Sequence, residues 1–162
     1  MSVKKIKQLS MNPHFYSLLI QGFLSGYQKP CDIKLACMAI PILLYSDSRE
    51  QLVHANSRSS MDSLFSQSQK MTESNLSGKV RLSGYIDRYN MLRPYCKKAV
   101  IISYSENKIA IKNQKIVLKN KIDYKIYEGK IKEWMKCSYY LGIIFSKTSL
   151  EHLSFFLGVD IK

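Results

Sequence analysis

The spacing of apolar residues predicts two helices in the first third of the chain. From Asn12 to Tyr27 apolar side chains recur every three to five positions, and an Asn-Pro pair suits the start of a helix. We expect Gly26 to end this helix. The segment from Cys31 to Tyr45 is apolar on nearly all sides, which predicts a helix at the centre of the core, kinked at Pro41.

Serines interrupt the hydrophobic pattern between Ser46 and Ser77. Two short helices are predicted there, Ser48 to Ala55 and Ser57 to Lys70, and each begins with a serine that can serve as a cap. The stretch from Thr72 to Gly78 has the composition of a loop. This region therefore predicts short helices joined by loops.

The period of the pattern changes after residue 104. A long helix is predicted from about Val80 to Tyr104, and Pro94 leaves two forms open, two helices or one kinked helix. Short β-branched runs follow at Lys108–Lys112 and Lys115–Lys119, separated by Asn113-Gln114. These runs predict a β-hairpin with lysines at the ends of both strands.

Helical spacing returns towards the C-terminus. One helix is predicted from Asp123 or Tyr127 to Lys147, and a short one from Ser149 to Leu157, closed by Gly158. The fold class is therefore α+β and mostly helical. This order of elements, a short helix, a long helix, a hairpin and a further helix, is also that of a winged-helix-like unit, in which the hairpin at about 108–119 would be the wing. Many small α+β domains share the same order.

The length of 162 residues suits a single compact unit spanning 1–162. Within it we expect an N-terminal helical lobe at 1–71. A basic lobe of helix, hairpin and helix is expected to pack on it at 79–162.

Basic residues are concentrated in the second half of the chain. The whole protein carries +13, and residues 79–136 hold 15 Lys or Arg against 5 Asp or Glu, a net +10. Such a surface fits a phosphate backbone, but an acidic protein partner and plain solvation remain open, and lysines at a hairpin edge also prevent aggregation. The candidate nucleic-acid-binding residues are Lys97, Lys98, Lys108, Lys112, Lys115, Lys119, Lys121 and Lys125.

Cysteine, histidine and apolar residues exclude several classes of protein. The cysteines lie in apolar segments without CxxC spacing and far from paired histidines, so we expect buried thiols in a reducing compartment, with no metal and no cofactor. The cysteines are Cys31, Cys37, Cys96 and Cys137.

No apolar run approaches the ~20 residues of a membrane span, and Met1 to Gln8 does not open a signal peptide. A cytoplasmic protein with no membrane partner is expected.

No motif of catalysis or phosphate binding occurs, so we do not expect an enzyme. The group Asp47, Arg49 and Glu50 admits two interpretations, an active site of unrecorded type or a short capped helix with a local ion pair. The pairs Tyr139-Tyr140 and Phe155-Phe156 could stack on nucleobases, but their helical spacing with apolar neighbours favours core or interface.

A pattern over nearly the whole chain resembles a known family. Its parts, taken in order, are Asn12-Pro13 with Gly26-Tyr27, the apolar segment Leu35 to Arg49, Arg88 to Ala99, Tyr140-Leu141-Gly142 through Phe145, and Leu157-Gly158-Val159. The chain thereby resembles the middle component of bacterial three-component ABC systems of the Lamassu type, which act against phages and plasmids.

The resemblance implies a non-catalytic adaptor that binds an SMC/Rad50-like ATPase and couples sensing of double-stranded DNA to an effector, often a nuclease. Two positions depart from the family pattern. Ile143-Ile144 stands where an Arg-Trp pair is frequent, and Tyr45-Ser46-Asp47 stands where a basic residue or histidine precedes Ser-Arg.

The alternative to this adaptor is a free-standing winged-helix transcription regulator, which would bind a specific duplex by itself. The surface that contacts a protein partner is unknown from the sequence.

Overall fold

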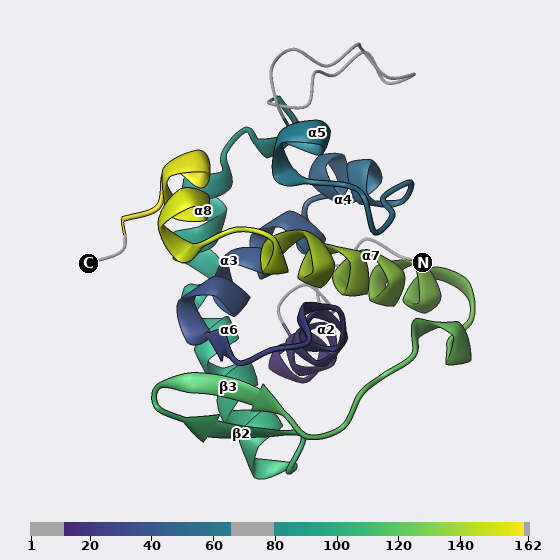
Figure 1. Cartoon of the computed structure of the whole chain (residues 1–162), viewed down its shortest axis with the longest axis vertical. Coiled ribbons are helices and arrows are strands. Elements are labelled where there is room, and N and C mark those ends of the chain that lie inside the picture. The colour runs from purple at the N-terminus through teal and green to yellow at the C-terminus, as the bar shows by residue number, and fades with distance from the viewer. Residues whose placement is uncertain (1–11, 66–79, 161–162) are drawn as a thin grey trace.

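The computed structural model describes residues 12–65 and 80–160. It shows helices packed around a common core with one small antiparallel sheet of three strands (Figure 1). The α+β, mostly helical fold class is therefore confirmed. In the part of the chain that is described, no helix combines the length and the apolar character that crossing a membrane requires.

Helix α2 (Pro13–Tyr27) forms the centre of the molecule. It packs on α7 (Gly129–Ser146) and α6 (Tyr85–Ser105), and Figure 1 shows it nearly end-on beneath α7. The predicted cap is confirmed, because the Asn12 side chain accepts a hydrogen bond from the N–H of His14 at 2.9 Å.

The prediction that Gly26 ends α2 is wrong. The helix ends at Tyr27, one residue later, and its cap is Gln28, which has a left-handed backbone with φ 62°. Gly26 instead faces α7, and a Cβ there would lie only 1.9 Å from the carbonyl oxygen of Tyr139. Glycine is needed for close helix packing at this position rather than for a turn.

The apolar segment predicted as the centre of the core becomes α3 (Ile33–Leu44), in which residues 35–43 are all buried. The helix begins two residues later than predicted. Cys31–Asp32 forms a short strand, β1, that pairs with the later hairpin. Pro41 lies within α3.

The two helices of the serine-rich region start at other residues than the sequence predicts. Helix α4 (Ser46–Leu52) starts before the expected Ser48, and the Ser48 hydroxyl donates to the carbonyl of Ile42 rather than capping α4. Helix α5 (Met61–Phe65) begins four residues after the expected Ser57, and residues 66–70 of the expected helix lie outside the described residues, as does the loop Thr72–Gly78.

The long helix predicted from Val80 begins later. A single 3₁₀ turn, η1 (Val80–Leu82), comes first, and Gly84 with φ 75° separates it from α6. Of the two forms left open by Pro94, the structure has one helix running through it to Ser105.

The predicted hairpin is confirmed as β2 (Ile109–Lys112) and β3 (Lys115–Leu118), and β1 adds to it in the order β1-β3-β2. Asn113 and Gln114 both have positive φ, 52° and 64°. Two such residues are what a two-residue turn of type I′ requires.

The C-terminal helices also start differently. A 3₁₀ turn, η2 (Tyr124–Ile126), precedes α7, so the predicted start at Asp123 or Tyr127 is wrong by at least two residues. Helix α8 (Leu150–Leu157) is confirmed, with Ser149 accepting from the N–H of His152 and Gly158 in a left-handed cap.

Segments from both expected lobes contribute to the core. Helix α2, from the N-terminal part, packs on α6 and α7 from the C-terminal part. The division into lobes at 1–71 and 79–162 stays a prediction, and its inner boundary falls outside the described residues.

Candidate nucleic-acid interface

The closed end of the hairpin carries two lysines side by side. Lys112 and Lys115 are direct cross-strand partners, and both are exposed. The buried residues of the hairpin, Ile109 and Ile116, point to the opposite face of the sheet from the two lysines and face the core. Opposed like charges destabilise a hairpin slightly, but Lys115 also has Asp32 of β1 as a cross-strand partner, and this carboxylate offsets part of the repulsion between the two lysines.

The open end of the hairpin is less available for binding. The Lys108 ammonium lies 3.0 Å from a Glu106 carboxylate oxygen, and its side chain is only 24% exposed. The Lys119 ammonium donates to the side-chain oxygen of Asn107. These two lysines fix the hairpin to the end of α6.

Lys97 and Lys98 are exposed on α6, the helix that precedes the hairpin in the sequence. The Lys98 ammonium lies 5.7 Å from the centre of the Tyr95 ring. Because a helix rises ~1.5 Å per residue, about 12 Å of helix separate Lys98 from Glu106, where the hairpin connection begins. These lysines extend the basic surface along α6 rather than joining the hairpin tip.

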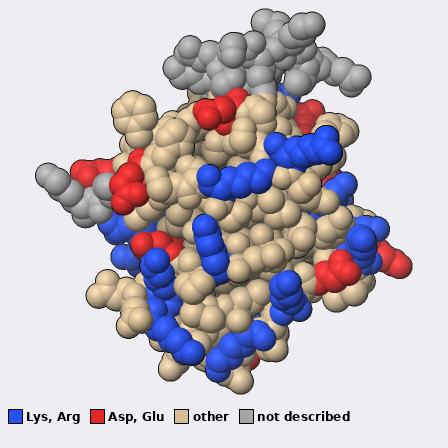
Figure 2. All heavy atoms as spheres, in the orientation of Figure 1, with Lys and Arg blue, Asp and Glu red and all other residues tan. Residues whose placement is uncertain are grey.

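Lys121 and Lys125 lie on the connection between β3 and α7. Two hydrogen bonds hold this connection on α2, from the Gln21 amide to the Asn120 carbonyl and from the Ile122 N–H to the Ser25 hydroxyl, each 2.9 Å. Lys121 and Lys125 are exposed. The eight predicted lysines thus lie in four places, and Figure 2 shows blue side chains gathered in its lower part, over the hairpin.

The tyrosine and phenylalanine pairs differ in exposure. Tyr139 and Tyr140 are half-buried, and Tyr124 lies against both of them. Phe156 is half-buried, whereas Phe155 is 88% exposed beside a hollow of about 770 Å³ between α5, η1 and α8. Tyr124 was not singled out in the sequence, because it meets the tyrosines of α7 only in the folded chain.

The group around Asp47 is organised by arginines. Arg49 donates to the carbonyls of Leu43 and Leu44, at the end of α3, and stacks 4.0 Å from the centre of the Trp134 ring. Glu50 pairs at 3.2 Å with Arg81, which is 1% exposed and comes from η1. The ion pair is therefore between distant segments, and the expectation of a local pair within α4 is wrong.

All four cysteines are buried, as predicted. Burial raises the pKa of the Cys137 thiol to about 12, and burial also raises the pKa of Cys31. A hydrogen bond to Cys37, together with burial, raises the pKa of Cys96. These thiols stay protonated at neutral pH, so they act as small apolar side chains.

Fold and surface together define a small, mostly helical protein whose basic residues surround a hairpin. The model of the family described as ABC-three component (ABC-3C) system Middle Component 3 matches residues 2–161, so the chain belongs to this family. It is a middle component, which works with an ABC ATPase and a further component. Searches of curated proteins and of solved structures gave no match.

Proposed function

We propose that this middle component is a non-catalytic adaptor in an anti-phage and anti-plasmid system of the Lamassu type. It binds an SMC/Rad50-like ATPase in the cytoplasm and couples the sensing of double-stranded DNA to an effector such as a nuclease. Family membership over residues 2–161 supports the association with an ATPase. An exposed aromatic such as Phe155 is typical of a surface that contacts a protein partner.

The observation that carries the DNA role is the lysine pair at the hairpin tip. Lys112 and Lys115 oppose each other and are both exposed, and among the described residues neither forms a salt bridge, whereas Lys108 and Lys119 have polar partners. A flexible ammonium group pairs with phosphate oxygens without reading base sequence. The tip therefore supports sequence-independent contact with a DNA backbone.

The test uses the assembled complex with Lys112→Glu and Lys115→Glu. We expect weaker binding of a blunt duplex, and a salt dependence of log K reduced by about 2, because each lost phosphate contact removes about 0.9 from the slope. Fluorescence anisotropy over a series of salt concentrations measures both quantities.

The matched control is Arg58→Glu with Lys132→Glu, which changes the net charge equally at exposed positions outside the hairpin. It should lower affinity through long-range charge alone and leave the salt slope nearly unchanged. If the hairpin variant and the control behave alike, the hairpin does not touch DNA, and only the scaffolding role remains.

The strand order favours one second candidate, a free-standing winged-helix regulator. β1 lies between α2 and α3, and β2 and β3 follow α6, which supports a unit with α6 in the major groove and the hairpin as a wing. Such a regulator would purify as a dimer and prefer one duplex sequence. Co-purification of the tagged chain with an ABC ATPase at fixed stoichiometry, without sequence preference, would exclude it.

A further inference from the structure

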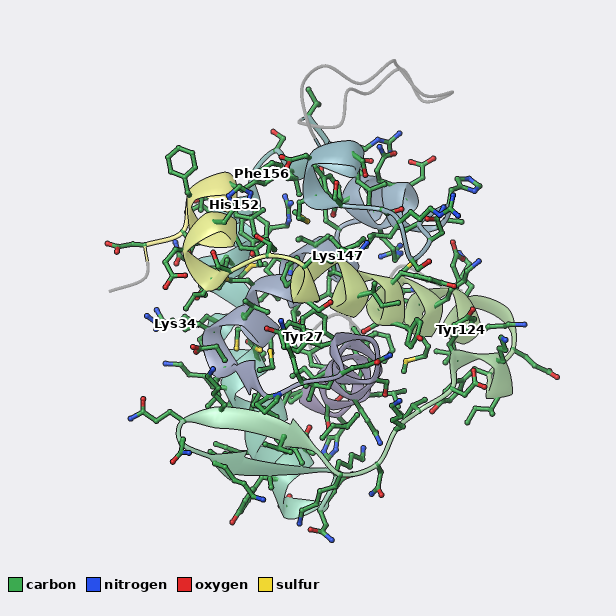
Figure 3. The ribbon with its side chains drawn as sticks, viewed as in Figure 1. Tyr27, Lys34, Tyr124, Lys147, His152 and Phe156 are labelled. Atoms are coloured by element: carbon green, nitrogen blue, oxygen red, sulfur yellow. The ribbon has the colours of Figure 1, made fainter. Side chains whose placement is uncertain are left out.

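A hollow of about 440 Å³ lies between the end of α2, the connection that carries η2, and α7. Lys121 and Lys125 line it, together with Tyr124, Tyr139 and Tyr140. Figure 3 labels Tyr124, which projects from the connection beside α7. The hollow therefore joins basic and aromatic side chains from segments far apart in the sequence.

The three tyrosines form a continuous aromatic wall. The centre of the Tyr124 ring lies 5.6 Å from that of Tyr139 and 6.1 Å from that of Tyr140, while Tyr139 and Tyr140 meet edge to face at 5.3 Å. All three are half-buried, so each keeps part of its surface at the hollow. Planar bases stack on such surfaces whatever their sequence.

The Tyr124 hydroxyl of this wall stays protonated at neutral pH. The Tyr124 and Tyr140 oxygens lie 3.5 Å apart, and this contact, with burial and neighbouring charge, raises the pKa of Tyr124 to about 12. A protonated hydroxyl adds a donor to the aromatic surface and no negative charge that would repel phosphate.

Charge at the rim of the hollow favours an anion. Lys121 and Lys125 are exposed, and their two charges outweigh the one carboxylate that lines the hollow, that of Asp123, which also accepts the N–H of Lys125. Lys121 also lines a second hollow, of about 350 Å³, with Lys29 and Lys119. Positive charge thus continues from the tyrosines to the strand β3 of the hairpin.

We propose that the tyrosine hollow binds one unpaired nucleotide of a DNA strand, with the base against Tyr124, Tyr139 and Tyr140 and the phosphate on Lys121 and Lys125. This rests on the proposed contact between the hairpin and DNA, and adds a preference for DNA with unpaired bases. An inorganic anion or an acidic peptide would use the lysines but would not require three aromatic rings.

The first experiment is photo-crosslinking of the assembled complex to a short oligonucleotide that contains 5-iododeoxyuridine. Mass spectrometry of the crosslinked peptides should find the attachment at Tyr124, Tyr139 or Tyr140. Attachment only at other residues would overturn the proposal, and this measurement needs no variant that might fail to fold.

The second experiment compares affinities for fluorescent oligo-deoxythymidine. Tyr124→Leu should weaken binding roughly ten-fold, as expected for the loss of one stacked base, while duplex affinity changes little. Tyr104→Leu, at an exposed tyrosine on α6, is the matched control. Equal effects of the two variants on the single strand would contradict the proposal.

The lysines are tested in the same assay. Lys121→Ala with Lys125→Ala should weaken single-strand binding more than Lys130→Ala with Lys132→Ala, which removes the same charge from the first turn of α7. Equal losses of affinity in the two double variants would contradict the binding of a phosphate by Lys121 and Lys125 at the hollow. Equally tight binding of poly-glutamate, independent of Tyr124, would overturn the nucleotide in favour of an acidic partner.

The two proposals fail separately. A complex that binds duplex but no single strand keeps the proposed function and overturns the tyrosine site. A complex that binds neither overturns both. Thymidine monophosphate that competes as strongly as the oligonucleotide would overturn the assignment to a DNA strand.

Discussion

Two glycines decide how closely the central helices approach each other. A Cβ at Gly26 would meet the carbonyl oxygen of Tyr139 at 1.9 Å, and one at Gly142 would meet that of Phe23 at 2.0 Å. The obstacles are backbone atoms of the facing helix, so no side-chain rotation relieves them. The α2–α7 pair therefore depends on glycine at both positions.

Gly142→Ala should destabilise the protein by at least about 3 kcal/mol, because backbone overlap forces the helices apart. Gly22→Ala is the matched control, since its Cβ would meet side-chain atoms alone: the flexible end of Met135 at 2.8 Å and Ser138 at 3.4 Å. The gain in helix propensity is the same for both variants. Urea denaturation measures the difference, and similar midpoints for the two variants would contradict the close-packing argument.

At the scale of elements, the hairpin is held by its turn and its base. The turn residues Asn113 and Gln114 both adopt positive φ, which strains a residue with a side chain more than glycine. The base is fixed to α6 by the contacts of Lys108 and Lys119. The sequence predicted both strands but not the third, because a two-residue strand such as β1 has no period of its own.

Gln114→Gly should stabilise the hairpin by about 1 kcal/mol relative to Gln114→Ala, because only glycine adopts this φ without strain. Both variants lose the glutamine side chain, so the difference in stability between them reflects the strain of the backbone at positive φ. Thermal unfolding of the two proteins provides the measurement. Equal melting temperatures would mean that the turn does not carry the strain inferred from its φ values.

The core of the whole molecule contains several acids that stay protonated. Burial raises the pKa of Tyr85, whose hydroxyl donates to the Met38 carbonyl at 2.6 Å, and raises that of Tyr27 to about 12. The Cys137 thiol behaves in the same way. In the unfolded chain these groups lose their protons at ordinary pKa values of 9.0 for cysteine and 10.0 for tyrosine.

Stability should therefore fall as pH rises above about 9, because the unfolded chain then binds fewer protons than the folded one. Below this pH the contribution is fully present. Urea midpoints at pH 8 and pH 10.5 test this expectation. Tyr85→Phe, which removes one such group, should be less stable at pH 8 and should lose less between the two values. An unchanged or larger loss would contradict the role of Tyr85.

Local patterns in the sequence were sufficient for most elements. The cap at Asn12, the buried run 35–43, the two strands of the hairpin and the closure of α8 at Gly158 all follow from spacing and from the chemistry of single residues. Helix starts were predicted less well. At Tyr85 and Gly129 a 3₁₀ turn precedes the helix, and neither turn has a distinct pattern of apolar residues.

The sequence by itself determined the fold class, the buried segments, the net charge and the middle-component pattern, because each depends on residue types and on neighbours within a few positions. Only the tertiary structure decided that Gly26 packs rather than ends a helix, that Glu50 pairs with Arg81, and that Tyr124 meets Tyr139 and Tyr140. These contacts join residues that lie 15 to 113 positions apart, and their partners are chosen by how helices pack, which no local pattern records.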